Sequence, residues 1–217
     1  MRFEDVLSRL ETLPAALPEA PRALIPVLAE SGELRPRFAD DGAVSRAAAV
    51  LVLLYPDETG DARIVLTERV DRGGHHSGEV SFPGGRSEPE DADLVATALR
   101  EAAEEVGLDV RAAGVRVIGT FPPLVIPVSN FAVTPVVAVA ARRPAFVPQA
   151  TEVARILEAS VRSFLPGADL VHVERELRGW LIRYAAYPVD GLAVWGMTAR
   201  VLGGLGAHLG TARADTG

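Results

Sequence analysis

The chain has 217 residues, and 48% of them are hydrophobic, which is enough for one large globular domain with a substantial core. A formal net charge of −7 argues against a nucleic-acid-binding protein that works through a basic surface, and the lack of cysteine excludes disulfides and thiolate metal sites. The amino terminus has acidic residues where a signal peptide would be basic, and the longest apolar run, residues 47–55, is far shorter than the roughly 20 residues that cross a bilayer. We therefore expect a cytoplasmic protein with no membrane segment.

Residues 1–44 contain two short helical patterns on either side of the proline-bearing stretch PAALPEAP. We expect this segment to pack on the domain, and a homodimer could form through it. Residues 47–54 and 62–70 are apolar, β-branched runs joined by the turn-rich sequence PDETGD, which predicts a hairpin. The stretch GEVSFPGG, residues 78–85, is typical of a short strand that ends in a turn.

A helix is predicted next, because Val95, Ala98, Leu99, Ala102, Ala103 and Val106 follow a helical period. Asp91 or Asp93 can cap its start, and Gly107 suits its end. Further strands are predicted at 115–121 and 130–141, a strand or turn with a short helix at 151–165, a closing hairpin at 170–189 and a final helix at 194–209. We expect one α+β (mixed α/β) domain over residues 45–210, with a central sheet between helices and a flexible tail at 211–217.

Three glutamates gather on the helix before Gly107. At about 100° per residue, Glu101, Glu104 and Glu105 fall within an arc of about 100°, roughly opposite the apolar face. Like charges four residues apart repel, so a bound cation would explain the cluster, and Mg²⁺ is typically held by carboxylates together with substrate phosphates. The alternative is a solvated helix face on which Arg100 and Glu104 form a weak pair.

The string GGRSEPEDADLVATALREAAEEVGL resembles the Nudix box, G-x5-E-x7-R-E-U-x-E-E-x-G-U, where U is aliphatic. Its second half agrees in register at Arg100, Glu101, Ala102, Glu104, Glu105, Gly107 and Leu108. In the first half, Asp91 stands at the acidic position counted from Gly85, and eight residues separate it from Arg100 where the pattern has seven. One extra loop residue costs little if the helix keeps its register.

This resemblance implies a Nudix-type α/β/α sandwich with a central mixed sheet, and hydrolysis of a diphosphate linked to another group. It implies that Glu101, Glu104 and Glu105 bind Mg²⁺ or Mn²⁺, with the Gly85 carbonyl as an addition. Arg100 would orient the glutamates. Glu152 stands where several relatives have an acid near the metals, so it is a candidate ligand or general base, and an exposed loop acid without a role is the alternative.

The stretch LTERVDRGGHHSGEVSFPGG, residues 66–85, resembles the segment that marks coenzyme A (CoA) pyrophosphatases within the family. Val70 and Gly74 depart from it, and Gly74 replaces an arginine that could grip a phosphate, a role that Arg72 could take. The matching and neighbouring residues suggest substrate contacts at Arg69, Arg72, His76 and Phe82. The alternative is that His76 is a loop histidine with no role in substrate binding.

The expected activity is cleavage of CoA or acyl-CoA to adenosine 3′,5′-bisphosphate and a 4′-phosphopantetheine. The protein is then expected to bind a small-molecule diphosphate, and neither a nucleic acid nor a membrane. Two alternatives stay open. One is another nucleoside diphosphate derivative, such as a nucleotide sugar, ADP-ribose or a dinucleotide, and the other is a non-catalytic Nudix-like binding module.

Overall fold

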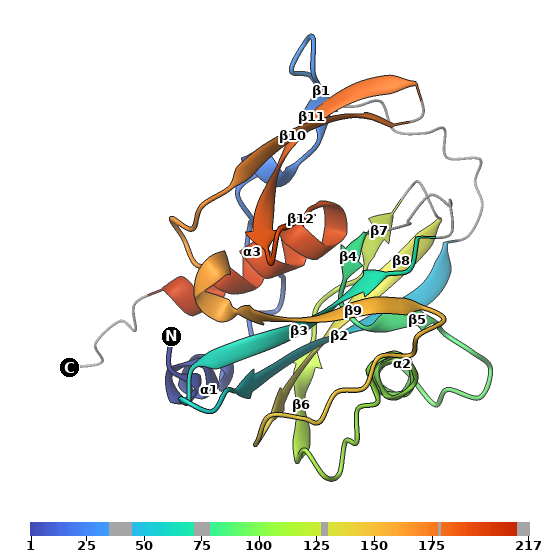
Figure 1. The fold of residues 1–217 in the computed structure, drawn as a ribbon, viewed down its shortest axis with the longest axis vertical. Coiled ribbons are helices and arrows are strands. Elements are labelled where there is room, and N and C mark those ends of the chain that lie inside the picture. Colours follow the sequence, from blue (N-terminus) through green and yellow to red (C-terminus); the bar gives the residue numbers. More distant parts are fainter. Residues whose placement is uncertain (35–44, 72–78, 127–129, 178, 212–217) are drawn as a thin grey trace.

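The computed structural model describes residues 1–34, 45–71, 79–126, 130–177 and 179–211 (Figure 1). Its helices are α1 (Phe3–Leu10), α2 (Leu94–Val106) and α3 (Gly196–Gly210), with 3-10 turns η1 (Arg22–Leu24) and η2 (Val161–Phe164). The main sheet contains β2 (Arg46–Pro56), β3 (Ala62–Arg69), β4 (Val80–Ser81), β5 (Gly84–Arg86), β6 (Val115–Thr120), β7 (Leu124–Ile126), β8 (Phe131–Ala140) and β9 (Val153–Ser160). A smaller sheet contains β1 (Val27–Leu28), β10 (Val171–Leu177), β11 (Trp180–Val189) and β12 (Leu192–Val194).

The main sheet is mixed, and its path runs β4-β3-β2-β8-β6. β2 and β3 form the predicted antiparallel hairpin, while β2 and β8 run parallel from Arg46 opposite Phe131 to Leu54 opposite Val139. Both central strands are almost entirely buried, as expected for apolar runs covered on two faces. β5 pairs with the first half of β2, and β9 pairs with β3.

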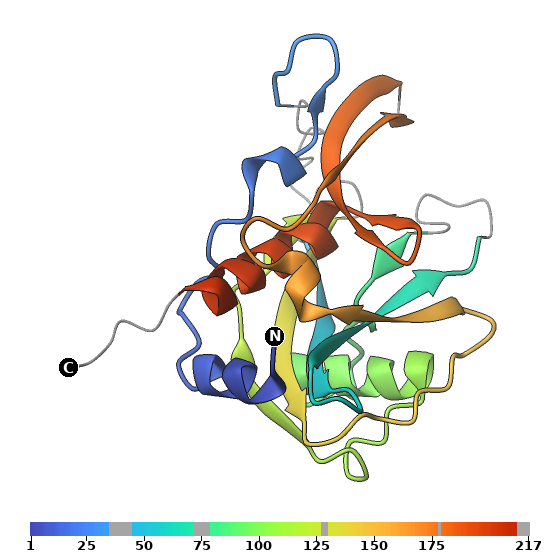
Figure 2. The ribbon, with the colours of Figure 1, turned by 60° about the vertical axis from the view of Figure 1, so that its left-hand side comes forward.

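Helices cover both faces of the main sheet, as Figure 2 shows with α2 on one side and α3 on the other. Successive residues of β2 alternate between the two sides: Ala49, Leu51 and Leu53 pack with α2, whereas Val50, Val52 and Leu54 join the core of α1 and α3. The predicted α/β/α sandwich is therefore confirmed. No helix in the described ranges is long and apolar enough to cross a membrane.

The smaller sheet and the N-terminal segment differ from the prediction. The hairpin of β10 and β11 does not extend the main sheet but builds a second sheet that projects beyond it (Figure 1). The second N-terminal helical pattern was wrong: only the turn η1 forms there, and β1 follows it and pairs with β11. Pro21 and Pro26 flank that turn, and proline lacks the amide hydrogen that a continued helix needs.

Candidate active site

The loop Phe82–Gly85 is held against β2 by the backbone. Leu51 N–H donates to the Pro83 carbonyl at 2.8 Å, and Gly85 is the register partner of Ala49. Gly84 has a φ of 155°, and a Cβ there would collide with the Ala49 carbonyl. A Cβ at Gly85 would overlap the Glu101 carboxylate. Gly84 is thus required for the close approach of this loop to β2, whereas a side chain at Gly85 would displace the Glu101 carboxylate.

Glu105 is buried beneath the loop, with 4% of its surface exposed. Its Oε2 accepts a hydrogen bond from Gly84 N–H at 3.1 Å. Burial raises the pKa of Glu105 to about 7, because the Gly84 N–H and the positive charge of Arg69 only partly offset desolvation, and the charges of Glu101 and Glu152 add to the rise. The alternative of a solvated helix face is excluded for Glu105, because this loop covers that side of α2.

Glu101 and Glu104 share one guanidinium nitrogen. Arg100 Nη1 donates to Glu101 Oε1 at 3.0 Å and to Glu104 Oε2 at 3.1 Å. The Glu101 side chain is only 16% exposed, and burial raises its pKa despite the contact with Arg100, whereas the Glu104 side chain is 59% exposed. Arg100 therefore spans two of the three predicted ligands.

Asp91 holds the other edge of that guanidinium. Arg100 Nε donates to Oδ1 at 3.0 Å and Nη2 donates to Oδ2 at 3.1 Å, and Asp91 also accepts from Glu88 N–H and the Thr97 hydroxyl, both at 2.9 Å. These bonds, above all those from Arg100, hold the pKa of Asp91 well below its usual range. Asp93, not Asp91, caps the start of α2, because its side chain accepts from Ala96 N–H at 2.8 Å. The extra residue of the loop thus leaves an acid in contact with Arg100, a role that sequence reasoning had not assigned to Asp91.

Arg69, at the end of β3, and Glu152, in the loop before β9, approach the cluster. Gln149 N–H donates to the Glu105 carbonyl and Val70 N–H donates to the Glu152 carbonyl, both at 2.9 Å, so the loop before β9 is tied to the end of α2 and to the end of β3. The Glu152 carboxylate is close enough to raise the pKa of both Glu101 and Glu105, and Arg69 is close enough to lower that of Glu105. The structure therefore brings four glutamates together with Arg69 and Arg100.

The remaining predicted substrate residues lie elsewhere. Phe82 is 1% exposed and packs in the apolar core, so its side chain supports the loop from within instead of presenting a surface to substrate. Arg72, Gly74 and His76 fall outside the described residues.

The donor set is suitable for a hard divalent cation, because all of its members are carboxylate oxygens and two are held in partly dry surroundings. Among the described residues, however, no three acidic or histidine side chains already converge into a closed metal-binding group. Arg100 Nη1 lies between Glu101 and Glu104, and Glu105 Oε2 is bonded to Gly84 N–H. A bound ion would have to take over part of the charge compensation that Arg100 provides.

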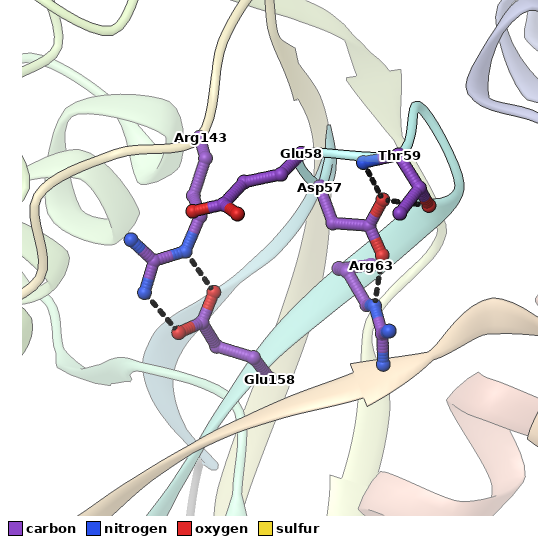
Figure 3. Close-up of a pocket in the computed structure, with 6 residues that line it drawn as sticks. All are labelled: Asp57, Glu58, Thr59, Arg63, Arg143 and Glu158. Atoms are coloured by element: carbon purple, nitrogen blue, oxygen red, sulfur yellow. Dashed lines mark hydrogen bonds and ion pairs between the residues drawn. The ribbon is translucent and has the colours of Figure 1, made fainter.

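A second group of charges lies at the opposite end of β2, around the turn into β3 (Figure 3). It surrounds a cavity of about 410 Å³ lined by Asp57, Glu58, Thr59, Arg63, Arg143 and Glu158. Here the arginines are matched to acids: Arg143 donates twice to Glu158, at 2.8 and 2.6 Å, and Arg63 Nε donates to Asp57 at 2.9 Å. This cavity contains none of the predicted site residues.

A domain family and several known proteins are similar in sequence to this chain. The family model of the NUDIX domain matches residues 45–159. Nudix hydrolase 15, mitochondrial, of Arabidopsis thaliana is 36% identical over 163 residues, which cover 72% of this chain and 56% of that protein. Nudix hydrolase 22, chloroplastic, of the same plant is 37% identical, with 72% of this chain and 53% of that protein covered. The chain thus spans about half the length of these plant relatives.

A bacterial relative is covered almost completely. The protein named uncharacterized Nudix hydrolase NudL of Enterobacter sp. (strain 638) is 36% identical over 182 residues, or 82% of this chain and 90% of that protein. Among solved structures, the Nudix hydrolase RenU of M. smegmatis is 25% identical, with a TM-score of 0.48 over 64% of this chain and 80% of that chain. From the domain match and the NudL similarity, the chain belongs to the Nudix family.

Proposed function

We propose that the protein is a divalent-metal-dependent pyrophosphohydrolase that cleaves the diphosphate of CoA or acyl-CoA. The observation that carries the proposal is the pair Glu101 and Glu105: the first is partly buried beside Arg100, the second is buried with a backbone N–H as its donor, and burial raises the pKa of both. Because uncompensated buried carboxylates are costly, a cationic ligand is the simplest reason for the arrangement. Nudix membership supports hydrolysis of a diphosphate as the use of that cation.

In this proposal Glu101, Glu104 and Glu105 hold Mg²⁺ or Mn²⁺, and the Gly85 carbonyl is an additional donor. Such an ion supplies Lewis-acid stabilisation of the developing phosphate charge and lowers the pKa of a bound water. Arg100, fixed by Asp91, holds the carboxylates of Glu101 and Glu104 in place.

Two residues at the margin of the cluster have separate roles. Arg69 is exposed, lies close enough to Glu105 to lower its pKa, and binds a phosphate oxygen of the substrate. Glu152 is exposed beside the buried pair and accepts a proton from the attacking water. The alternative is that Glu152 is an additional metal ligand. The pH dependence of turnover in Glu152→Gln separates base from ligand, because only the loss of a general base removes the fall in rate at low pH from the pH–rate profile.

The test is incubation of the purified protein with CoA and Mg²⁺ or Mn²⁺, followed by separation of the products. We expect adenosine 3′,5′-bisphosphate and 4′-phosphopantetheine, and we expect chelation with EDTA to abolish their formation. Release of neither product with any divalent ion would overturn the CoA proposal, and the same assay with Glu101→Gln excludes a contaminating enzyme.

The second candidate is hydrolysis of another nucleoside diphosphate derivative, namely a nucleotide sugar, ADP-ribose or a dinucleotide. Gly74, where an arginine is expected in the CoA-type segment, is the observation that favours it. Ranking these compounds and CoA by kcat/KM discriminates the two, since CoA should rank at or near the top if the first candidate holds. Binding of such compounds without hydrolysis would support a non-catalytic module, which the complete set of carboxylates argues against.

A further inference from the structure

Thr97 is a polar residue on the buried side of α2. It has no exposed surface, and it shares this complete burial with Ala98, Ala102 and Val106, which pack in the core between α2 and the main sheet. A buried hydroxyl is costly unless it has a hydrogen-bond partner. Valine would fill nearly the same space without that cost, so the reason for a threonine lies in what its hydroxyl contacts.

The hydroxyl of Thr97 has two acceptors at hydrogen-bond distance. Asp91 Oδ2 lies at 2.9 Å and the carbonyl oxygen of Asp93 lies at 3.3 Å. A hydroxyl has only one hydrogen to donate, and the carbonyl four residues earlier is the usual acceptor for a threonine inside a helix. The shorter distance and the negative charge of the carboxylate direct that hydrogen to Asp91 instead.

Asp91 is a buried carboxylate that this bond helps to orient. Its side chain is 4% exposed. Its Oδ1 accepts from Arg100 Nε, and its Oδ2 accepts from Arg100 Nη2, from Glu88 N–H and from the Thr97 hydroxyl. Glu88 is exposed in the loop before α2, whereas Thr97 is anchored in the core. Thr97 is therefore the donor that ties the Asp91 carboxylate to the body of the helix.

Arg100 transmits the position of Asp91 to two glutamates. A guanidinium has five N–H donors in one plane, and those of Arg100 are directed to Asp91, to the Arg86 carbonyl and to the carboxylates of Glu101 and Glu104. A planar group held on all its edges moves as one unit. A change in the orientation of Asp91 would therefore shift the carboxylates on the opposite edge of the guanidinium.

We propose that Thr97 is a positioning residue of the metal site: its hydroxyl orients the Asp91 carboxylate and, through Arg100, sets the positions of Glu101 and Glu104. The inference rests on the proposed function, because its consequence for turnover depends on metal binding by these two glutamates. Thr97 is fully buried and acts only through Asp91.

The test compares Thr97→Val, which keeps the shape and loses the donor, with Thr97→Ser, which keeps the hydroxyl. In Thr97→Val the Mn²⁺ concentration for half-maximal CoA hydrolysis should rise about three- to tenfold, while KM for CoA and kcat at saturating Mn²⁺ stay within about twofold of the wild type. Thr97→Ser should restore the wild-type Mn²⁺ requirement. Thr198→Val is the matched control, because Thr198 is a buried threonine on α3, across the main sheet from α2, and this variant should keep the wild-type values.

A second measurement does not depend on hydrolysis. In EDTA, NMR can follow the exchange with water of the Arg100 Nε hydrogen, which is bonded to Asp91 and whose resonance is assigned by its absence in Arg100→Lys. Exchange should be equally slow in the wild type and Thr97→Ser, and faster by about threefold or more in Thr97→Val, because Asp91 is then held less firmly.

Equal exchange rates in all three proteins would overturn the inference. So would an unchanged Mn²⁺ requirement in Thr97→Val, or a Thr97→Ser enzyme as impaired as Thr97→Val, because the effect would then come from packing and not from the hydroxyl. A wild type without metal-dependent hydrolysis would refute the proposed function, and the exchange rates would still decide whether Thr97 holds Asp91 and Arg100 in place.

Discussion

The two ends of β2 hold charged groups in opposite ways. At the turn into β3, Glu158 is bonded to Arg143 and to the hydroxyl of Tyr55, and these bonds lower its pKa even though burial alone would raise it. Beside the glycine loop, the carboxylate of Glu105 accepts from Gly84 N–H and from no other donor in the described residues, and its pKa is raised to about 7. The first carboxylate is compensated within the fold, whereas the second is not.

This difference separates a structural network from a binding site. A carboxylate that accepts two hydrogen bonds from one arginine already has its charge neutralised, so binding an added cation there is worth little free energy. Buried acids that also repel one another retain an unmet attraction for a cation, which is the energetic basis of a metal site. We therefore do not assign the chemistry to the cavity of Figure 3, whose arginines are already paired with acids.

The largest expected effect is on turnover in Glu101→Gln. Metal stabilisation of a transition state is worth several kcal/mol, so kcat should fall about a hundredfold or more. Glu90→Gln is the matched control, because Glu90 is exposed in the loop before α2 and should retain nearly full activity. Steady-state assays on both variants at limiting Mg²⁺ decide this, and a Glu101→Gln enzyme of near wild-type rate would refute the assignment.

A smaller loss is expected when the support of Arg100 is removed. Asp91→Asn deprives Arg100 of its bidentate anionic partner, so the carboxylates of Glu101 and Glu104 should lose their fixed positions and kcat should fall about tenfold. Asp93→Asn controls for the loss of a nearby charge, since asparagine caps a helix as well as aspartate does. If the two variants showed equal rates, Arg100 would not depend on Asp91.

The pH dependence of stability tests the state of Glu105. Its pKa in the folded protein, about 7, lies above the ordinary value of 4.5, so folding favours the protonated form. Relative to Glu105→Gln, the wild type should be most stable below pH 4.5 and should lose about 1–3 kcal/mol as the pH rises to 7. Urea unfolding of both proteins in EDTA measures this, and parallel stability curves would show that Glu105 is compensated after all.

The smallest effect is expected at the other end of β2. Arg143→Ala removes a half-exposed partner of Glu158, so it should cost no more than about 1 kcal/mol of unfolding free energy and leave kcat unchanged. A joint measurement of thermal unfolding and CoA hydrolysis checks both parts. A clear loss of turnover would mean that this network is coupled to the catalytic end.

Local signals predicted the elements well and their contacts less well. The bounds of α2 follow from the cap at Asp93 and the left-handed Gly107, both of which are short-range features that a sequence displays. The burial of Glu105 depends on a loop that pairs with β2 more than thirty residues earlier in the chain, so helical periodicity could place it opposite the apolar face but could not show that it is buried. The contact of Asp91 with Arg100 was likewise hidden, because the path of the intervening loop is set by tertiary packing.

Metal-dependent stabilisation tests the central claim most directly. Thermal unfolding with and without Mn²⁺ should show a rise in Tm for the wild type and for Glu158→Gln, because the end of β2 at the turn contributes no ligand. The rise should be largely absent in Glu105→Gln, which keeps the shape of the side chain and loses its charge. Equal shifts in all three proteins, or a shift lost only in Glu158→Gln, would contradict the assignment of the metal site to α2.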